Sequence, residues 1–485
     1  MLFNSWGYLL FLLAVLPLHW VLPHGRLRIG LLGVASILFY GMWRWEFCFL
    51  VLLSACIDFF AARRIHATED ARVRRRWLAL SLVVNLGLLV FFKYTYFLYD
   101  NVRLVGSVVG ADLASLQDLG VRIVLPLGIS FYTFQTISYS IDVYRGISKP
   151  VDSFASFLTY VTFWPQLIAG PVLRASEVIP QLEAPRRFSW DDTLLGSRMI
   201  VVGLFKKVVL ADSLAPMVDE AFAKDAGTLG ALDVWVSTFL FGFQIYFDFA
   251  GYSTIALGSA LLVGLRFPAN FNWPYVSKSP REFWQRWHIS LSSWIRDYLY
   301  LPLTGQAFRA KSTGGIAVAA SDAQRNRALL LTWLIMGLWH GSAWTFVLWG
   351  LYHALLILLF RHVGVLDRLA RSAPALALGL MLPLSMAGWI AFRAESVTQA
   401  LTMYGTLLNP LAYDLGSRSV DIYSYFWAFL FTIGMLGSYW VHRLAARGRL
   451  AWPVVWLGTS GALAVMVCLI LTCMRQQKQF IYFQF

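Results

Sequence analysis

Charged side chains are scarce in this sequence, and their scarcity excludes an ordinary water-soluble protein. Asp, Glu, Lys and Arg make up 14% of the 485 residues, whereas 58% are hydrophobic. A helix needs about 20 mostly apolar residues to cross a bilayer, and runs of that kind recur along the whole chain. We therefore predict an all-α polytopic membrane protein, with one integral membrane domain over residues 1–485 and about 11 spanning helices plus re-entrant elements.

Cysteine is also rare, and its placement indicates neither a disulfide framework nor a metal site. The four cysteines lie within or beside apolar runs, and none forms a CxxC pair. Disulfide-stapled and zinc-binding domains use paired, regularly spaced cysteines. We expect these thiols to act as small hydrophobic side chains and expect no bound metal.

Acidic residues are fewer than basic ones, 26 against 40, yet the excess does not indicate nucleic-acid binding. The basic residues form short clusters between apolar runs instead of one continuous face. Six arginines between positions 63 and 76 share one connection, which the positive-inside rule places in the cytoplasm. Counting back over the apolar runs puts the N terminus outside. The run at 1–22 lacks the basic start and cleavage site of a signal peptide, so we expect a retained helix.

Several short catalytic motifs are missing as well. The sequence has no nucleophile elbow GxSxG, no phosphate-binding GxxxxGK[ST] and no dinucleotide-binding GxGxxG. These absences disfavour serine hydrolases of the elbow type, P-loop ATPases and Rossmann enzymes.

Two stretches that are present do not read as lipid-facing helices. Residues 264–304 mix four prolines with charges and many aromatic residues, and residues 121–146 are interrupted by Pro126 and Gly128. Unsatisfied backbone amides are costly in hydrocarbon, so the first stretch should line an enclosed, partly wet cavity or lie at the interface. We expect the second to form a kinked or re-entrant helix.

One histidine, His340, lies inside an apolar run of residues 327–360 that contains no acidic residue. An ionisable group at such depth is a functional candidate, although a purely structural hydrogen bond between helices weighs about equally. Gly337 and Gly341 permit close approach, and Trp339 and Trp344 could form pocket walls. A neutral imidazole there could take a proton from a hydroxyl, as acyl transfer to an alcohol requires.

Two other histidines are less informative by themselves. On one continuous helix, His353 would lie about 220° around the axis from His340, so we expect it to be structural and outside that site. This spacing also disfavours a zinc pair of the HExxH kind. His288 lies in the aromatic stretch, where an interfacial anchor is the simpler interpretation.

Four ordered motifs resemble the membrane-bound O-acyltransferases, and among them the bacterial branch that acetylates alginate. They are LPLGISFYTFQTISYSIDVYRG at 125–146, FWPQLIAGPVLR at 163–174, NFNWPYVSKSPREFWQRWHISLSSWIRDYLYLPL at 270–303 and MGLWHGSAWTFVLWGLYHALL at 336–356. The ending FIYFQF at 480–485 is typical of the same branch. The resemblance covers essentially the whole chain.

This resemblance implies a ring of tilted helices around a central funnel, in which a cytoplasmic acyl donor meets an acceptor from the other side. By resemblance, His340 would be the general base and His288 a partner that orients or polarises the thioester or the acceptor. The same motifs contain four further residues, which are candidates for substrate binding: Trp339, Trp284, Arg281 and Asp297.

We therefore expect transfer of acetyl groups from acetyl-coenzyme A across the bacterial inner membrane to an exported polysaccharide such as alginate or cellulose, with a periplasmic acyltransferase as partner. Thr254 stands where relatives usually have an acidic residue, which weakens an assignment to alginate alone. Peptidoglycan and teichoic acid are alternative acceptors. A channel that passes acetyl groups without covalent chemistry, or a scaffold for a secretion complex, are alternative functions.

Overall fold

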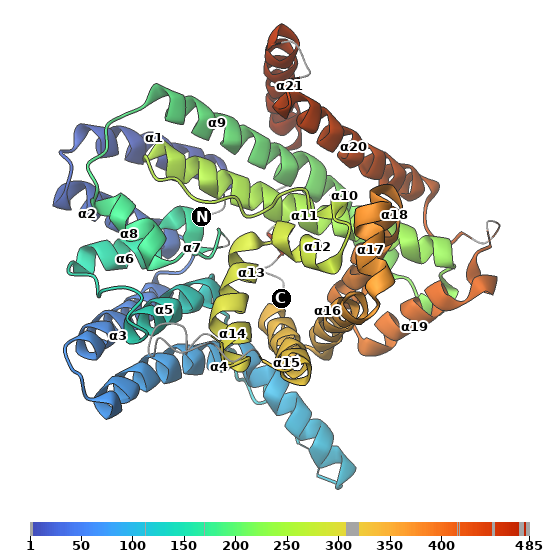
Figure 1. The fold of residues 1–485 in the computed structure, drawn as a ribbon, viewed down its shortest axis with the longest axis horizontal. Coiled ribbons are helices and arrows are strands. Elements are labelled where there is room, and N and C mark those ends of the chain that lie inside the picture. Colours follow the sequence, from blue (N-terminus) through green and yellow to red (C-terminus); the bar gives the residue numbers. More distant parts are fainter. Residues whose placement is uncertain are drawn as a thin grey trace. The chain divides into compact units, whose positions relative to one another are not determined.

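The computed structural model describes residues 3–111, 113–168, 170–306, 320–414, 416, 418–448, 452–474 and 480–481 of the chain. Every regular element within these residues is a helix, as Figure 1 shows. The prediction of an all-α protein is confirmed for this part of the chain.

The chain forms two compact units, of which the first comprises residues 1–197 and 256–268. Its helices are α1 Trp6–Val21, α2 Arg26–Gly41, α3 Cys48–His66, α4 Ala71–Val108, α5 Ile129–Tyr144, α6 Phe154–Thr162, α7 Trp164–Leu167 and α8 Ala175–Glu183, with the 3₁₀ turn Trp45–Phe47 before α3. The start of α9 (Trp190–Leu204) and the end of α11 (Ala231–Leu262) also belong to this unit.

A buried polar network joins α3, α4 and α5 in the first unit. Asp58 of α3 is fully buried and accepts hydrogen bonds from three side chains. The donors are Ser81 Oγ, Asn85 Nδ2 at 2.7 Å and Ser140 Oγ at 2.8 Å. Buried polar groups need such partners, and a network that satisfies them specifies how the three helices pack.

The second unit comprises residues 198–255 and 269–485. Its helices are the end of α9, the π-helix Phe205–Ala211, α10 Asp212–Ala223, the first part of α11, α12 Pro280–Arg286, α13 Ile289–Ile295, the π-helix Arg296–Tyr300, α14 Leu301–Leu303, α15 Asp322–His340, α16 Trp344–His362, α17 Gly364–Ser372, α18 Pro374–Arg393, α19 Val397–Leu408, α20 Ile422–Ala446 and α21 Trp452–Cys473. Short 3₁₀ turns lie at Ala226–Thr228, Pro274–Val276 and Pro410–Ala412.

Close backbone contact joins α9 to α11 in this unit. A Cβ atom added to Gly203 would lie 2.7 Å from the carbonyl oxygen of Gly251, so no larger residue fits at the crossing. Just beyond it, Lys207 forms a buried ion pair with Asp212 at 2.8 Å and with Asp248 at 2.6 Å. A buried cation needs such partners, because water is excluded from this crossing.

Five described helical segments are long and apolar enough to cross a membrane: Trp45–His66, Ala71–Val108, Ala231–Leu262, Trp344–His362 and Pro374–Arg393. Two shorter helices, Trp6–Val21 and Gly458–Cys473, are also apolar. The count of about 11 spans, their ring arrangement and a single domain over residues 1–485 remain predictions.

The two irregular stretches differ in how well the sequence predicted them. Residues 264–304 are broken into short helices and extended segments, as expected. In the stretch at 121–146, residues 121–126 are not helical and α5 begins directly after Gly128, so Pro126 does not kink a helix; the re-entrant alternative stays a prediction. Gly128 has φ +71°, and a Cβ there would lie 2.4 Å from the carbonyl oxygen of Leu167, so both conformation and space favour glycine.

Candidate active site

The hairpin of α15 and α16 positions His340, which lies at the end of α15. A Cβ atom on Gly337 would lie 2.2 Å from the carbonyl oxygen of Phe346, and one on Gly350 would lie 2.3 Å from that of Trp333. The two backbones therefore approach as closely as glycine alone allows, which is the packing that small residues permit between membrane helices. In Figure 1 this hairpin lies beside α12 and α18, which contact α16.

The apolar run at 327–360 is thus two helices and not one. Helix α15 ends at His340, residues Gly341 to Ala343 are extended or bent, and α16 begins at Trp344. The expectation of one continuous helix through His340 and His353 is wrong. The turn folds α16 back along α15, and Trp349 contacts both imidazoles, with ring centroids 4.8 Å from His340 and 4.9 Å from His353.

His340 is buried at the C-terminal end of α15, with 4% of its surface exposed. Aromatic rings from three helices surround it: Trp339 of α15 at 4.9 Å, Trp349 of α16 at 4.8 Å and Phe392 of α18 at 5.4 Å between ring centroids. Such rings exclude water from the imidazole. A neutral imidazole in this position could exchange a proton with a bound hydroxyl group.

His288 lies in the turn between α12 and α13 and is fully buried. Its backbone adopts φ +42° and ψ +56°, a left-handed conformation that costs roughly 1–3 kcal/mol for a residue other than glycine. The structure holds this strained conformation through Asn270, whose backbone oxygen accepts from the Ile289 amide at 2.9 Å. Strain maintained in this way is typical of functional positions.

The side chain of Asn270 also orients the imidazole of His288. Its amide oxygen lies 3.1 Å from Nδ1 of His288 and accepts from the backbone and hydroxyl of Ser290 at 3.2 and 2.8 Å. With an oxygen acceptor facing it, Nδ1 carries the proton and Nε2 carries the lone pair. Burial lowers the pKa of His288 to about 3, so the ring is neutral at pH 7.

Aromatic rings connect the two histidines. Phe271 lies against His288 at 6.3 Å and against Trp287 at 5.1 Å, and Trp287 contacts Trp389 at 4.8 Å. Phe392 continues the series, at 5.5 Å from Trp389 and 5.4 Å from His340. The structure thus places both predicted catalytic residues in one unit, on an aromatic layer built from four different segments.

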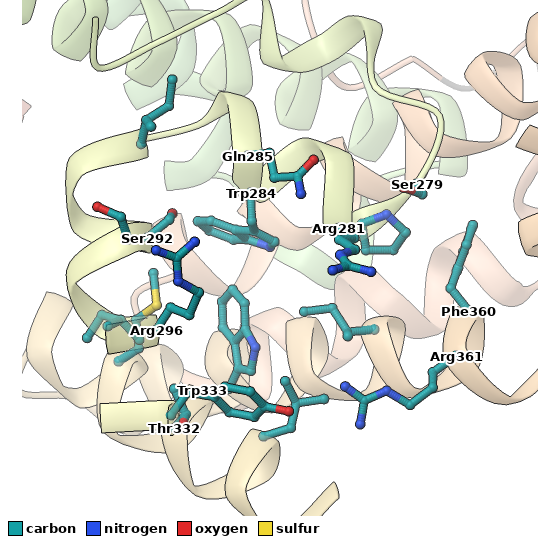
Figure 2. A pocket seen from close by; sticks show the side chains of 18 of the residues that line it. Ser279, Arg281, Trp284, Gln285, Ser292, Arg296, Thr332, Trp333, Phe360 and Arg361 are labelled. Atoms are coloured by element: carbon teal, nitrogen blue, oxygen red, sulfur yellow. The ribbon is translucent and has the colours of Figure 1, made fainter. Parts of the chain in front are cut away.

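A cavity of about 700 Å³ lies in the same unit, within the size range of ligand pockets, and neither His288 nor His340 lines it. Figure 2 shows two indole rings, Trp284 and Trp333, next to one another in its wall, with centroids 4.6 Å apart. Three guanidinium groups also line it: Arg281, Arg296 and Arg361. Flat aromatic walls combined with fixed positive charges suit a ligand that carries both an aromatic or apolar part and several phosphates.

Of the four other predicted site residues, two line this cavity and two do not. Arg281 and Trp284 line it. Asp297 pairs with the lining residue Arg296, whose Nε lies 2.7 Å from Oδ1 of the carboxylate. Trp339 instead contacts His340.

Several neighbours of the site were not predicted: Asn270, Trp333, Trp349, His353 and Arg361. No local sequence signal marks Asn270, which lies 18 residues from the histidine that it orients. A helix break at Gly341 would have placed His353 opposite Trp333, because an antiparallel hairpin pairs positions at similar distances from its turn.

Comparison with known proteins gives a consistent result. The family model described as MBOAT, membrane-bound O-acyltransferase family, matches residues 151–387, a range that includes all six predicted site residues. The chain is 39% identical over 414 residues to the probable alginate O-acetylase of Azotobacter vinelandii, covering 84% of this chain and 78% of that protein. The probable alginate O-acetylase of Pseudomonas aeruginosa is 38% identical over 410 residues, with 84% and 75% covered. The peptidoglycan O-acetyltransferase of Helicobacter pylori is 35% identical over 398 residues, with 76% and 72% covered.

Proposed function

The chain belongs to the membrane-bound O-acyltransferase family and is an O-acyltransferase, and from this premise we propose that it moves acetyl groups from cytoplasmic acetyl-coenzyme A across the bacterial inner membrane, for attachment to an exported polysaccharide. The five apolar helices support a multi-pass arrangement. We propose about 11 spans in a ring around a central funnel. The arginine cluster at 63–76 supports a cytoplasmic position for the connection between α3 and α4, and therefore an N terminus outside.

The observation that carries this proposal is the enclosure of His340 by three aromatic rings at the end of α15. In the proposed step, the neutral imidazole takes the proton of the acceptor hydroxyl while the hydroxyl oxygen attacks the carbonyl carbon of the thioester. The new C–O bond forms, the C–S bond breaks, and the sulfur leaves as the thiolate of coenzyme A, which then receives a proton. A positioned base of this kind contributes roughly 10²–10⁴-fold to a rate.

His288 has a supporting role in this proposal. Its Nδ1 is held by Asn270, so its Nε2 lone pair has a fixed direction. We propose that His288 orients the acceptor by accepting a hydrogen bond from a second, non-reacting hydroxyl of the sugar, while His340 removes the proton of the reacting hydroxyl. Trp339 keeps water away from His340 by packing on its ring.

The cavity lined by Trp284 and Arg281 supports acetyl-coenzyme A as the donor. Coenzyme A carries an adenine ring and phosphate groups, and arginine side chains recognise phosphates through several parallel hydrogen bonds. Arg296 and Arg361 add two further cations, and Asp297 fixes the first of them through its ion pair. No resident cofactor is needed for this chemistry.

The acceptor is proposed from the relatives. Two of them are named for alginate and one for peptidoglycan, so a sugar polymer outside the cytoplasm is the acceptor class that we propose, with alginate or cellulose before peptidoglycan or teichoic acid. A periplasmic acyltransferase would receive the acetyl group and pass it to the polymer. Such a partner would explain how a membrane-embedded site serves a polymer in the periplasm.

The test is polysaccharide acetylation in a strain that lacks the native gene and carries a plasmid-borne copy. We expect the wild-type copy and H66A to restore the acetyl content of the exported polymer and H340A to leave it at the deletion level. His66 is an exposed histidine at the end of α3, so it controls for loss of a histidine as such. Equal membrane levels of the three proteins, measured by immunoblot, are required.

Other outcomes separate the alternatives. Full acetylation with H340A would contradict base catalysis and favour a channel that passes acetyl groups without chemistry. Binding of acetyl-coenzyme A to the purified protein tests the scaffold alternative. A protein that binds no acetyl-coenzyme A, yet is needed for acetylation, would be a scaffold.

A further inference from the structure

His353 occupies a closed aromatic box in the second unit. Its ring is 2% exposed and contacts Trp284 at 5.0 Å, Trp333 at 5.4 Å and Trp349 at 4.9 Å between ring centroids. Phe283 lies parallel to it at 6.4 Å. Three indoles from three helices thus face one imidazole.

The polar atoms of this box have no hydrogen-bond partner among the described residues. This is true of Nδ1 and Nε2 of His353 and of the indole nitrogens of Trp284 and Trp349, all of which are buried. Leaving a buried donor or acceptor unsatisfied costs roughly 1–3 kcal/mol each. The imidazole edge packs closely against Gly388 of α18, but close packing alone gives no reason for two buried nitrogen atoms at this position.

The box adjoins the cavity on one side and His340 on the other. Trp284 and Trp333 line the cavity and contact His353, as Figure 2 shows for the two indoles in the cavity wall. Trp349 contacts His353 and His340. The box therefore lies between two rings that line the cavity and one ring that contacts His340.

We propose that His353 is a binding residue for the thioester end of the acyl donor. The inference rests on the proposed function and deepens it. One imidazole N–H and two indole N–H groups offer three donors, and the carbonyl oxygen of an acyl thioester is an acceptor that matches them. Rotation of the Trp284 or Trp333 side chain would admit the thioester, and Trp349 is the ring that the box shares with His340.

The test compares two ligands that differ only in the carbonyl group. Acetyl-coenzyme A has the thioester carbonyl, and S-ethyl-coenzyme A has a methylene in its place. Equilibrium binding of each is measured with the whole protein in lipid nanodiscs, for wild type, H353F, H353Q and the exposed-site control H66F. H353F keeps an aromatic ring in the box but removes both nitrogens.

We expect wild type and H66F to bind acetyl-coenzyme A about tenfold more tightly than the ethyl analogue, the difference that one satisfied hydrogen bond of about 1.4 kcal/mol produces. H353F should bind both ligands with the affinity of the ethyl analogue. H353Q, whose amide restores a donor, should recover part of the preference. In acetyl transfer, H353F should raise KM for acetyl-coenzyme A by a similar factor.

Two results would overturn the inference: wild-type protein that does not distinguish the two ligands, or H353F that keeps the preference. The first needs no variant, so the inference stays testable if H353F does not fold. Wild-type protein that binds neither ligand would instead contradict the proposed donor.

Discussion

Replacing Gly350 with alanine should force α15 and α16 apart at the crossing that holds His340. The added Cβ would lie 2.3 Å from the carbonyl oxygen of Trp333 and 3.4 Å from Cα of Gly337. Ordinary contact begins at 3.4 Å, so the first distance falls short by 1.1 Å (3.4 minus 2.3). Both neighbouring atoms are backbone, and neither can turn aside as a side chain would.

The effect should reach both stability and activity. Overpacking of this kind costs about 1–3 kcal/mol, so the melting temperature of the purified protein should fall by several degrees. The neighbouring residue Trp349 contacts His340, so the same movement displaces the wall of the site. A misplacement of about 1 Å can lower a rate about 100-fold.

The assay pairs thermal unfolding in detergent with acetyl transfer, and Gly379→Ala is the matched control. Gly379 lies in the interior of α18, and a Cβ there meets nothing within 4 Å. This control should be neutral or stabilised by up to about 1 kcal/mol, because alanine favours helices over glycine. If Gly350→Ala behaved like Gly379→Ala in both assays, the close crossing of α15 and α16 would be refuted.

Three further substitutions test other parts of the structure. Asn270→Ala removes the oxygen that orients His288, so acetyl transfer should fall roughly tenfold or more while binding of acetyl-coenzyme A changes little. Arg361→Gln removes one of three cations from the cavity, so KM for acetyl-coenzyme A should rise several-fold, and more at low than at high ionic strength. Asp58→Asn weakens three buried hydrogen bonds to a carboxylate, each contributing about 1.5–3 kcal/mol, so the melting temperature should fall by several degrees.

Exposed residues of the same types provide the controls: Asn409→Ala, Arg447→Gln and Asp191→Asn. Each should match wild type in the assay of its partner substitution. Unchanged turnover in Asn270→Ala would contradict the proposed orientation of His288 by Asn270. An unchanged KM in Arg361→Gln would contradict phosphate binding by Arg361 in the cavity. A melting temperature for Asp58→Asn equal to wild type would show that the network does not stabilise the first unit.

The burial of His340 could be predicted from the sequence, because an ionisable residue inside an apolar run is recognised without knowledge of distant contacts. It also indicated the irregular backbone at 264–304, since four prolines cannot all continue a membrane helix. Both signals are local. Each depends on residue types within a few positions of the feature.

The features that the sequence did not reveal depend on long-range contacts. The break between α15 and α16 at Gly341 contains no proline, so the apolar pattern of residues 327–360 predicted one continuous helix. For this reason the contact of Trp349 with both His340 and His353 was not predicted. The orientation of His288 by Asn270 depends on a chain reversal between them, and no pattern of residue types specifies it.

The cavity was also beyond sequence reasoning, for a related reason. Arg281 and Arg296 come from the aromatic stretch, whereas Arg361 comes from the end of α16. The packing of α12 on α16, and of the π-helix Arg296–Tyr300 on α15, brings these cations to one space. The resemblance identified motif residues, and the structure shows which of them share a cavity wall.

The central claim is that His340 performs chemistry on a donor that other residues bind. The most direct measurement determines both quantities in one sample: the Kd of acetyl-coenzyme A and the single-turnover rate of acetyl transfer, for wild type and H340A in nanodiscs supplied with acceptor. For H340A we expect a Kd within about twofold of wild type and a transfer rate lower by roughly 10²-fold or more. A folded H340A protein that transfers acetyl groups at the wild-type rate would contradict this claim.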